Sequence, residues 1–155
     1  MIQVTSNLKA GSAAFLKKIN RVLGAENLDK MERTIAFEMA GAMRERINEQ
    51  GKDSSGGDIG TYTPSYVRRR VRKYNRTADT KVILSLTRQM ENDMTGGPIM
   101  TLDGWGIGFK NPHNYDKSQW TEATYDKKIF SLTEQEKADV RKIAEDFISR
   151  GIQQL

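Results

Sequence analysis

Residues 28–50 form the stretch LDKMERTIAFEMAGAMRERINEQ, which decides the fold because it predicts one long helix. Apolar side chains recur there at every fourth position and therefore share one helical face. The members of this ridge are Met31, Ile35, Met39, Met43 and Ile47. Gly51 follows, at the place where a helix commonly ends in a left-handed residue. Phe37 falls away from the ridge, and it is either a scattered surface aromatic or a contact with another subunit.

Further helices are expected on both sides of this one in the sequence. Ser12 is a candidate N-cap for a helix over residues 12–23. Near the C-terminus, Thr133 and Glu136 have the spacing of a capping box. The apolar stripe behind that box predicts a closing helix that ends near Gly151.

Strand signals lie in the middle of the chain. Residues 82–84 are the compact apolar run Val-Ile-Leu, which predicts a strand. The dipeptide Asp103-Gly104 favours a two-residue type I′ turn, so residues 99–102 and 105–109 are expected to pair as a hairpin.

Two segments show no period and are expected to protrude as irregular loops, at about 52–63 and 110–128. Between them, Thr87 is a candidate cap of a short helix that runs to about Met94. The expected fold class is α+β, in which long N-terminal and C-terminal helices pack on a small antiparallel sheet. We expect a single domain over residues 1–155.

The composition limits the classes of protein that fit. The chain has 155 residues, of which 37% are hydrophobic and 29% charged, and it contains no cysteine. Disulfide frameworks and thiolate chemistry are therefore excluded. No apolar run is long enough for a membrane span, and the first residues lack the apolar core of a signal peptide. A soluble, intracellular protein without membrane contact is expected.

Positive charge is concentrated in residues 64–81, which hold seven Lys and Arg against one Asp. The whole chain has a formal charge of +5, so this segment accounts for all of the excess. If residues 65–76 are helical, Tyr66, Val67, Val71 and Tyr74 lie on one side. The cations opposite them are Arg68, Arg69, Arg72, Lys73 and Arg76. Arg70 falls inside the apolar stripe, where it needs an acidic partner or an edge position because an unpaired buried guanidinium is costly.

Three interpretations of this basic segment remain open. It is a solvated helix face, a contact to nucleic-acid phosphates with tyrosines that stack on bases, or a protein interface. We favour the protein interface, because arginine and aromatic residues are enriched in interface cores. The candidate interface residues are Phe37, Tyr62, Tyr66, Arg68, Arg69, Arg70, Arg72, Lys73, Tyr74 and Trp120.

Catalytic signals are weak. His113 is the single histidine and has no second metal ligand at a suitable spacing. Asp53 and Asp58 flank a glycine turn, but a calcium loop needs more oxygen ligands at fixed offsets. The glycines around Trp105 lie in a hairpin strand and do not precede a helix, as a phosphate-binding loop requires. We expect no catalytic residues, no metal and no cofactor, and hence no enzyme.

The order of features resembles the virion-morphogenesis family of tailed phages, which includes neck and tail-completion proteins at the head–tail joint. The resemblance covers roughly residues 35–150 and lies in four segments. They are Arg44–Asp53 (RERINEQGKD), Tyr62–Tyr66 (YTPSY), Val82–Met90 (VILSLTRQM) and Ile129–Glu136 (IFSLTEQE). Two departures are the absence of a glycine after Thr87 and the sequence YDKKI where the family has small residues and proline.

This resemblance implies a structural role as a hexameric or twelvefold ring subunit in the virion, assembled in the host cytoplasm. The implied partners are adjacent head-connector and tail proteins, with DNA passing through the lumen of the ring. Contacts between subunits would be head-to-tail and would close into a cycle. The alternative is a small basic DNA- or RNA-binding protein.

Overall fold

The computed structural model describes residue 17, residues 19–101 and residues 104–153. The fold is α+β, and helices dominate it. The helices are α2 (Ala25–Arg44), the π-helical turn η1 (Glu45–Glu49), α3 (Pro64–Tyr74), α4 (Gln89–Thr95), α5 (Pro112–Tyr125) and α6 (Glu134–Gln153). The strands β1 (Ile99–Thr101) and β2 (Gly104–Gly106) form one antiparallel hairpin.

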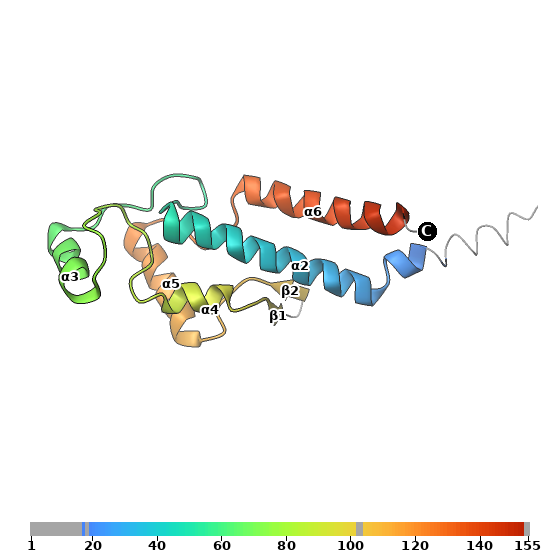
Figure 1. The fold of residues 1–155 in the computed structure, drawn as a ribbon, viewed down its shortest axis with the longest axis horizontal. Coiled ribbons are helices and arrows are strands. Elements are labelled where there is room, and N and C mark those ends of the chain that lie inside the picture. The colour runs from blue at the N-terminus through green and yellow to red at the C-terminus, as the bar shows by residue number, and fades with distance from the viewer. Residues whose placement is uncertain (1–16, 18, 102–103, 154–155) are drawn as a thin grey trace, which may run out of the picture.

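The molecule is elongated and organised around α2 (Figure 1). Helix α6 runs along one side of α2, while α4 and the hairpin lie along the other. Helices α3 and α5 are found near the end at which α2 finishes. The expectation that both long helices pack on the sheet is therefore half right, because α2 contacts β2 but α6 packs chiefly against α2.

The ridge predicted on α2 is confirmed, and the burial of its side chains increases toward the C-terminal end of the helix. Met39, Met43 and Ile47 are buried, whereas Met31 and Ile35 are only half-buried. The helix begins earlier than expected, at Ala25, and its last turn is the π-helical η1.

The turn η1 buries three consecutive side chains, those of Arg46, Ile47 and Asn48. A regular α-helix spreads three successive residues over 200° of its surface, so it cannot bury all three against one neighbour. The wider turn is closed by the amide of Gln50, which donates to the carbonyl of Glu45 over 2.9 Å. Gly51 follows with φ +63°, and a Cβ there would collide with the carbonyl oxygen of Val82.

The hydrophobic core lies at the η1 end of α2. Its fully buried members come from α2, η1, α4 and three irregular segments, and they are Met43, Ile47, Ile59, Tyr62, Val82, Met94 and Ile129. No residue from the first two-thirds of α2 belongs to this cluster. We call this region the compact end, and the paired α2 and α6 beyond it the arm.

The strand predicted at residues 82–84 is wrong. Thr61 and Lys81 form an isolated bridge, but no described strand includes residues 82–84. Val82 is buried and its amide donates to the carbonyl of Gly60 over 3.0 Å. The carbonyl of Leu84 accepts from the side chain of Asn48 at 2.9 Å, so a side chain takes the place of a ladder partner.

The irregular loop predicted at residues 110–128 is also wrong, because α5 occupies most of it. Asn111 caps this helix by accepting from the amide of His113 at 3.0 Å, and Pro112 is its first residue. The only described residues of α5 that are fully buried are Asn114 and Ser118, four positions apart. Both are polar, which explains why no hydrophobic period is visible in this stretch.

Smaller differences concern boundaries. The hairpin pairs Thr101 with Gly104, which places Gly104 in β2; Asp103, the first residue of the expected turn, lies outside the described residues. The cap of α4 is Arg88 with φ +58°, not Thr87. Of the helix expected over 12–23, residues 17 and 19–22 are helical, and residues 12–16 and 18 lie outside the described part.

The start of α6 follows the prediction. Thr133 and Glu136 form the capping box, in which each residue's amide donates to the other's side chain, over 2.7 and 3.0 Å. The helix then continues to Gln153, slightly beyond the expected end. None of the described helices is both long and apolar enough to cross a membrane.

Candidate functional site

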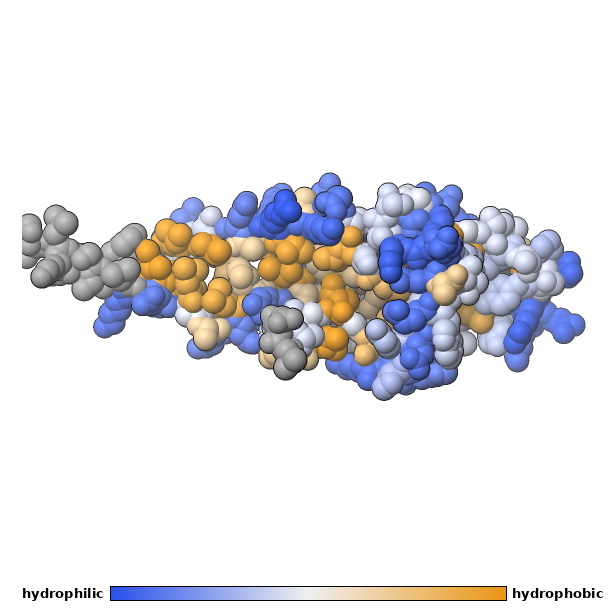
Figure 2. Space-filling view, turned by 180° about the vertical axis from the view of Figure 1, so that it is seen from behind, coloured by the Kyte–Doolittle hydropathy of each residue, from blue (hydrophilic) through white to orange (hydrophobic). Residues whose placement is uncertain are grey.

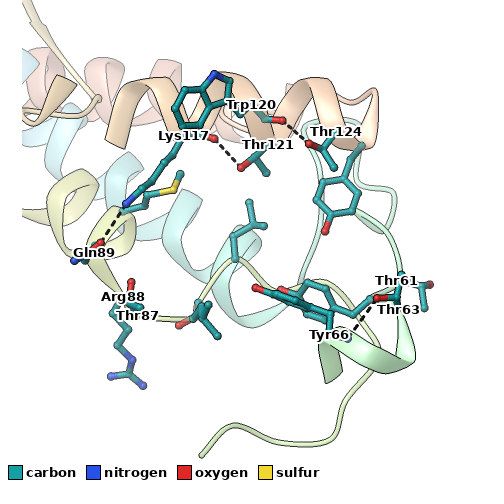
Figure 3. A pocket seen from close by; sticks show the side chains of 16 residues that line it. Thr61, Thr63, Tyr66, Thr87, Arg88, Gln89, Lys117, Trp120, Thr121 and Thr124 are labelled. Atoms are coloured by element: carbon teal, nitrogen blue, oxygen red, sulfur yellow. Dashed lines mark hydrogen bonds between the residues drawn. The ribbon is translucent and has the colours of Figure 1, made fainter. Parts of the chain in front are cut away.

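A groove of about 700 Å³ opens between α3, α5 and the irregular segment that leads into α4 (Figure 3). We call it the α3–α5 groove. Its lining residues are Thr61, Tyr62, Thr63, Tyr66, Leu84, Ser85, Leu86, Thr87, Arg88, Gln89, Met90, Lys117, Trp120, Thr121, Thr124 and Tyr125. The volume falls in the range that proteins use to hold ligands or short segments.

The floor of the groove, residues 84–90, is fixed from behind although only Gln89 and Met90, the first residues of α4, have regular structure. The side chain of Arg76 donates two hydrogen bonds to the carbonyl of Leu86, at 2.8 and 3.1 Å. Asn48 holds the neighbouring carbonyl of Leu84. These contacts satisfy backbone groups that lack strand partners and keep the floor in place.

Glu91 provides a third anchor beneath the floor. It is buried and accepts hydrogen bonds from the hydroxyl of Ser85 and from Nε of Arg44, each at 2.8 Å. Burial raises the pKa of Glu91, but the hydrogen bonds from Arg44 and Ser85 outweigh it and leave the pKa below its ordinary value. The carboxylate is therefore charged and ties the floor to α2.

The α3 wall is set by a local signal in the sequence. Thr63 caps the helix by accepting from the amide of Tyr66 at 3.4 Å, and Pro64 begins it. At its other end Asn75 takes a left-handed conformation, and its amide donates to the carbonyl of Val71. Tyr66 consequently projects from the first turn toward the groove (Figure 3).

Arg70 does not have the acidic partner or edge position that the sequence led us to expect. It is 2% exposed and forms no ion pair with any described carboxylate. Its guanidinium lies 4.5 Å from the ring centre of Tyr62 and 6.0 Å from that of Tyr66. It also donates to the hydroxyl of Tyr62 at 3.1 Å. Aromatic faces thus stabilise this cation in place of a carboxylate.

Tyr62 connects Arg70 to Ile83, the residue directly before the floor of the groove. Its hydroxyl donates to the carbonyl of Ile83 while it accepts from Arg70. Burial is the main cause that raises the pKa of Tyr62 to about 12, against the lowering effect of Arg70. The phenol is therefore neutral and can serve as donor and acceptor at once.

The α5 wall carries one aromatic and several hydroxyl groups. Trp120 is 60% exposed, and the hydroxyls of Thr121 and Thr124 donate to carbonyls within the helix at 2.7 Å. Lys117 reaches across the groove and donates to the side chain of Gln89 at 3.2 Å (Figure 3). Tyr125 closes the groove against the backbone of Gly60.

The charged residues that line the groove are all positive. Arg88 and Lys117 are its charged lining residues, and none of the residues that line it in the described chain is acidic. Exposed cations follow on α3. Arg69 and Lys73 were expected on the side opposite Tyr66, but they lie on its ridge, three and seven positions further on. Arg68 and Arg72 lie on the opposite side of the helix, and Val71 between the two sides is 42% exposed.

The residues proposed from sequence as an interface do not form one surface. Tyr66 and Trp120 line the groove, with Arg69 and Lys73 beside it. Tyr62 and Arg70 are buried, so neither can meet a partner in this conformation. Tyr74 is half-buried, and Arg68, Arg72 and the 63% exposed Phe37 lie elsewhere on the surface.

Sequence reasoning missed the residues that α5 contributes to the groove, apart from Trp120. These are Lys117, Thr121, Thr124 and Tyr125. The dipeptide Asn111-Pro112 was the available signal, because it repeats the arrangement of cap and first helical residue seen at Thr63-Pro64.

The residues considered for chemistry lie in the following surroundings. His113 is exposed near the start of α5, with its ring 6.2 Å from that of Trp120. Asp53 accepts from the amides of Ser55 and Gly57 and pairs with Lys127, so it organises its own loop. Among the described residues no cluster of three or more His, Cys, Asp or Glu could hold a metal ion.

A second surface feature lies on the arm. Seen from behind, an apolar surface runs along the helix pair between polar borders (Figure 2). Every apolar member of the stripe on α6 is only half-buried, and Glu136 is the one described residue of that helix that is fully buried. The half-buried apolar residues of the pair are Leu28, Met31, Ile35, Val140, Ile143, Ala144, Phe147 and Ile148.

Comparisons with known proteins add no assignment. A scan against protein-family models found no match, and searches of curated proteins and of solved structures found no significant similarity.

Proposed function

We propose that the chain is a structural subunit of a tailed-phage neck or tail-completion ring, which joins the head connector to the tail. The observation that carries this proposal is the half-buried apolar stripe of α6. An amphipathic helix normally buries its apolar face completely, because that burial supplies most of its stability. A second protein surface is needed to complete this one.

A neighbouring copy is the occupant that we propose for the apolar surface of the arm. The half-buried apolar residues run from Leu28 to Ile35 on α2 and from Val140 to Ile148 on α6, which is about 10–12 Å along each helix. Extended apolar patches with polar rims mark association sites in soluble proteins. A contact between the arm of one copy and a different surface of the next repeats head-to-tail and closes into a ring.

The resemblance in four segments to virion-morphogenesis proteins supports the same proposal. These segments lie at structurally decisive positions here: η1 with its following turn, the start of α3, the floor of the α3–α5 groove, and the entry to α6. Residues in such places position elements relative to one another, as a structural protein requires. In this proposal the protein carries no catalytic site and acts in the virion.

Assembly can be tested at the open end of the arm, where Gly151 of α6 packs against Val22. Leu23 is 42% exposed there, and Leu23→Asp places a charge on the surface without disturbing the core. The matched control is Val71→Asp, because Val71 is equally exposed but lies on α3. We expect the wild type and the control to form rings in mass photometry and sedimentation velocity, and Leu23→Asp to shift them toward the monomer.

Two results would overturn this proposal. One is a wild-type chain that stays monomeric at all concentrations and is absent from purified particles. The other is an equal effect of both substitutions on assembly, since that would mean that the arm has no special role.

Binding of DNA or RNA is a second candidate function, favoured by the exposed cations of α3. None of Arg68, Arg69, Arg72 and Lys73 forms an ion pair with a described residue. Phosphate contacts would make affinity fall steeply with salt. Absence of any gel shift at low salt would eliminate this candidate.

A further inference from the structure

We propose that the α3–α5 groove binds an acidic peptide segment that inserts an aromatic or aliphatic side chain between Tyr66 and Trp120. This site lies on α3 and α5, away from the arm, and the inference goes beyond assembly. It assigns to the groove a partner of defined chemistry, an extended stretch of another protein in which carboxylates flank an apolar anchor.

The walls of the groove fit such an anchor. Tyr66 stands on one side and the 60% exposed Trp120 on the other, and Leu84, Leu86 and Met90 contribute apolar surface to the lining (Figure 3). A side chain that enters a groove lined by aromatic and aliphatic residues buries much apolar area, and such anchors dominate the energetics of interfaces. A large apolar side chain is therefore the preferred occupant.

The positive charges of the groove determine which residues of the peptide are favoured on either side of its anchor. Arg88 and Lys117 line it, Arg69 and Lys73 extend the same ridge as Tyr66, and no described lining residue is acidic. Cations that line a groove without an acidic neighbour in the lining attract carboxylates and repel basic segments. The peptide that fits best carries Asp or Glu on both sides of its anchor.

The groove is built before any partner arrives. Arg76 and Asn48 hold the carbonyls of Leu86 and Leu84, and Glu91 holds Ser85. The α3 wall is tied through Tyr62 to the residue directly before the floor, because the Tyr62 hydroxyl donates to the carbonyl of Ile83. A floor fixed in this way does not have to be ordered on binding, which removes part of the entropic cost of association.

The lining favours a peptide over a nucleic-acid strand. Strand-binding grooves follow the backbone with many cations, because phosphates supply most of the affinity. Only Arg88 and Lys117 of the residues that line this groove are cations, and Lys117 is already engaged with Gln89. The remaining lining offers apolar surface and hydroxyls, which suit side chains and peptide groups.

The test uses the full-length protein and three soluble probes in fluorescence anisotropy at physiological salt. They are the random copolymer of glutamate and tyrosine, poly-glutamate, and oligothymidylate of similar net charge. We expect the copolymer to bind at least about tenfold more tightly than either of the others, because only it combines anchor and charge. Equal binding of poly-glutamate, or tighter binding of oligothymidylate, would overturn the proposal.

Matched variants locate the binding. Trp120→Ala removes an exposed wall of the groove, and Tyr115→Ala removes an equally accessible aromatic of α5 that does not line it. We expect about a tenfold loss of copolymer affinity for the first and none for the second. Equal affinities for both variants would contradict the proposed anchor site.

A second pair of variants distinguishes the effect of the cations next to the groove on copolymer binding from the effect of the net charge of the protein. The double substitution of Arg69 and Lys73 by Ser removes the cations beside Tyr66. The same substitution of Arg68 and Arg72 removes an equal charge from the far side of α3. The first pair must weaken copolymer binding more than the second, and equal losses would mean that only net charge matters.

Failure of the groove proposal can be distinguished from failure of the ring proposal. Leu23→Asp alters the arm and leaves every groove residue in place. Copolymer binding by a monomeric Leu23→Asp variant would support the groove even if no ring exists. Rings without copolymer binding would refute the groove alone.

Discussion

The apolar ridge of α2 is buried to different degrees at the two ends of the helix. At the compact end, the ridge of α2 and η1 is buried by a complete hydrophobic cluster, and Ile47 is fully buried. On the arm the same ridge continues with Met31 and Ile35, but only α6 and the hairpin cover the helix and these side chains stay half-buried. The ridge is therefore fully buried at the compact end and only half-buried on the arm.

Polar groups follow the same division. The compact end buries Arg46, which pairs with Glu136 over 2.8 Å and donates to the carbonyls of Lys52, Ile129 and Ser131. The ion pairs of the arm, such as that between Lys30 and Glu26, are exposed to solvent. This difference indicates that the buried contacts that stabilise the fold are concentrated in the compact end, and in the ring proposal a neighbouring copy completes the arm.

The largest effect is expected at the centre of the compact end. Arg46→Ala leaves Glu136 buried without its partner and frees three carbonyls from their donor. Breaking a buried pair of this kind costs about 3–5 kcal/mol. Urea unfolding followed by circular dichroism measures the loss, with Arg141→Ala on the exposed side of α6 as control. Similar losses in both variants would contradict the assigned role.

A direct comparison of the two regions uses the same truncation in each. Ile129→Ala removes a fully buried side chain and is expected to cost about 2–5 kcal/mol. Ile143→Ala on the arm removes a half-buried one and should cost about 1 kcal/mol in the monomer. The arm variant should lose more in assembly than in stability, which sedimentation velocity can measure. An equal cost for both in the monomer would refute the division into core and arm.

Smaller effects are expected around Arg70. Tyr62→Phe removes the hydroxyl that accepts from Arg70 and should cost about 1–3 kcal/mol. Arg70→Met replaces the buried cation by an apolar chain of similar length and should change stability by about 1 kcal/mol or less. If the hydroxyl matters chiefly as a partner of Arg70, Tyr62→Phe costs less in the Arg70→Met background. Strict additivity in this double-mutant cycle would refute the coupling.

The smallest effect concerns acid. The exposed carboxylate of Asp58 lies 2.7 Å from Nζ of Lys52 and 3.0 Å from Nζ of Lys81. Hydrogen bonds from these two lysines lower the pKa of Asp58 from 3.8 to about 2. Because the pKa is lowered by folding, the stabilisation is complete above the unfolded pKa and is lost as the pH falls toward the folded one.

Asp58→Asn should therefore reduce the dependence of the urea midpoint on pH between about pH 4 and about pH 2. The control is Asp116→Asn, an exposed carboxylate of α5 that pairs with no described cation. Identical pH profiles for the wild type and Asp58→Asn would show that the two lysines do not stabilise the fold.

Local signals predicted the helices that carry their own caps or ridges. The capping box at Thr133, the Thr63-Pro64 start of α3 and the ridge of α2 act within a few residues, so they are visible without tertiary structure. The α+β class followed from them and from the hairpin near Asp103-Gly104. Boundaries shifted by a few residues because helix ends depend on what packs against them.

The features that sequence reasoning missed depend on contacts with residues that are distant in the sequence. Helix α5 buries Asn114, which donates to the side chain of Asp93 at 3.0 Å, and Ser118, and buried polar residues leave no hydrophobic period to detect. Residues 82–84 have the composition of a strand, but loop and side-chain groups take their hydrogen bonds. Arg70 was correctly identified as unusual, yet its partner is an aromatic ring and not the acid that charge alone suggested.

The π-helical turn has a consequence for how the chain tolerates changes in length. Because η1 contains one residue more per turn than an α-helix, deleting a single residue within Glu45–Glu49 would let the regular spiral continue. The chain after the turn would keep about its present direction, because five residues of the wider turn rotate through nearly the same angle as four α-helical residues. The turn itself would no longer bury Arg46, Ile47 and Asn48 in succession, although composition and length would hardly change. Insertions and deletions are therefore expected to accumulate in homologous sequences outside this turn.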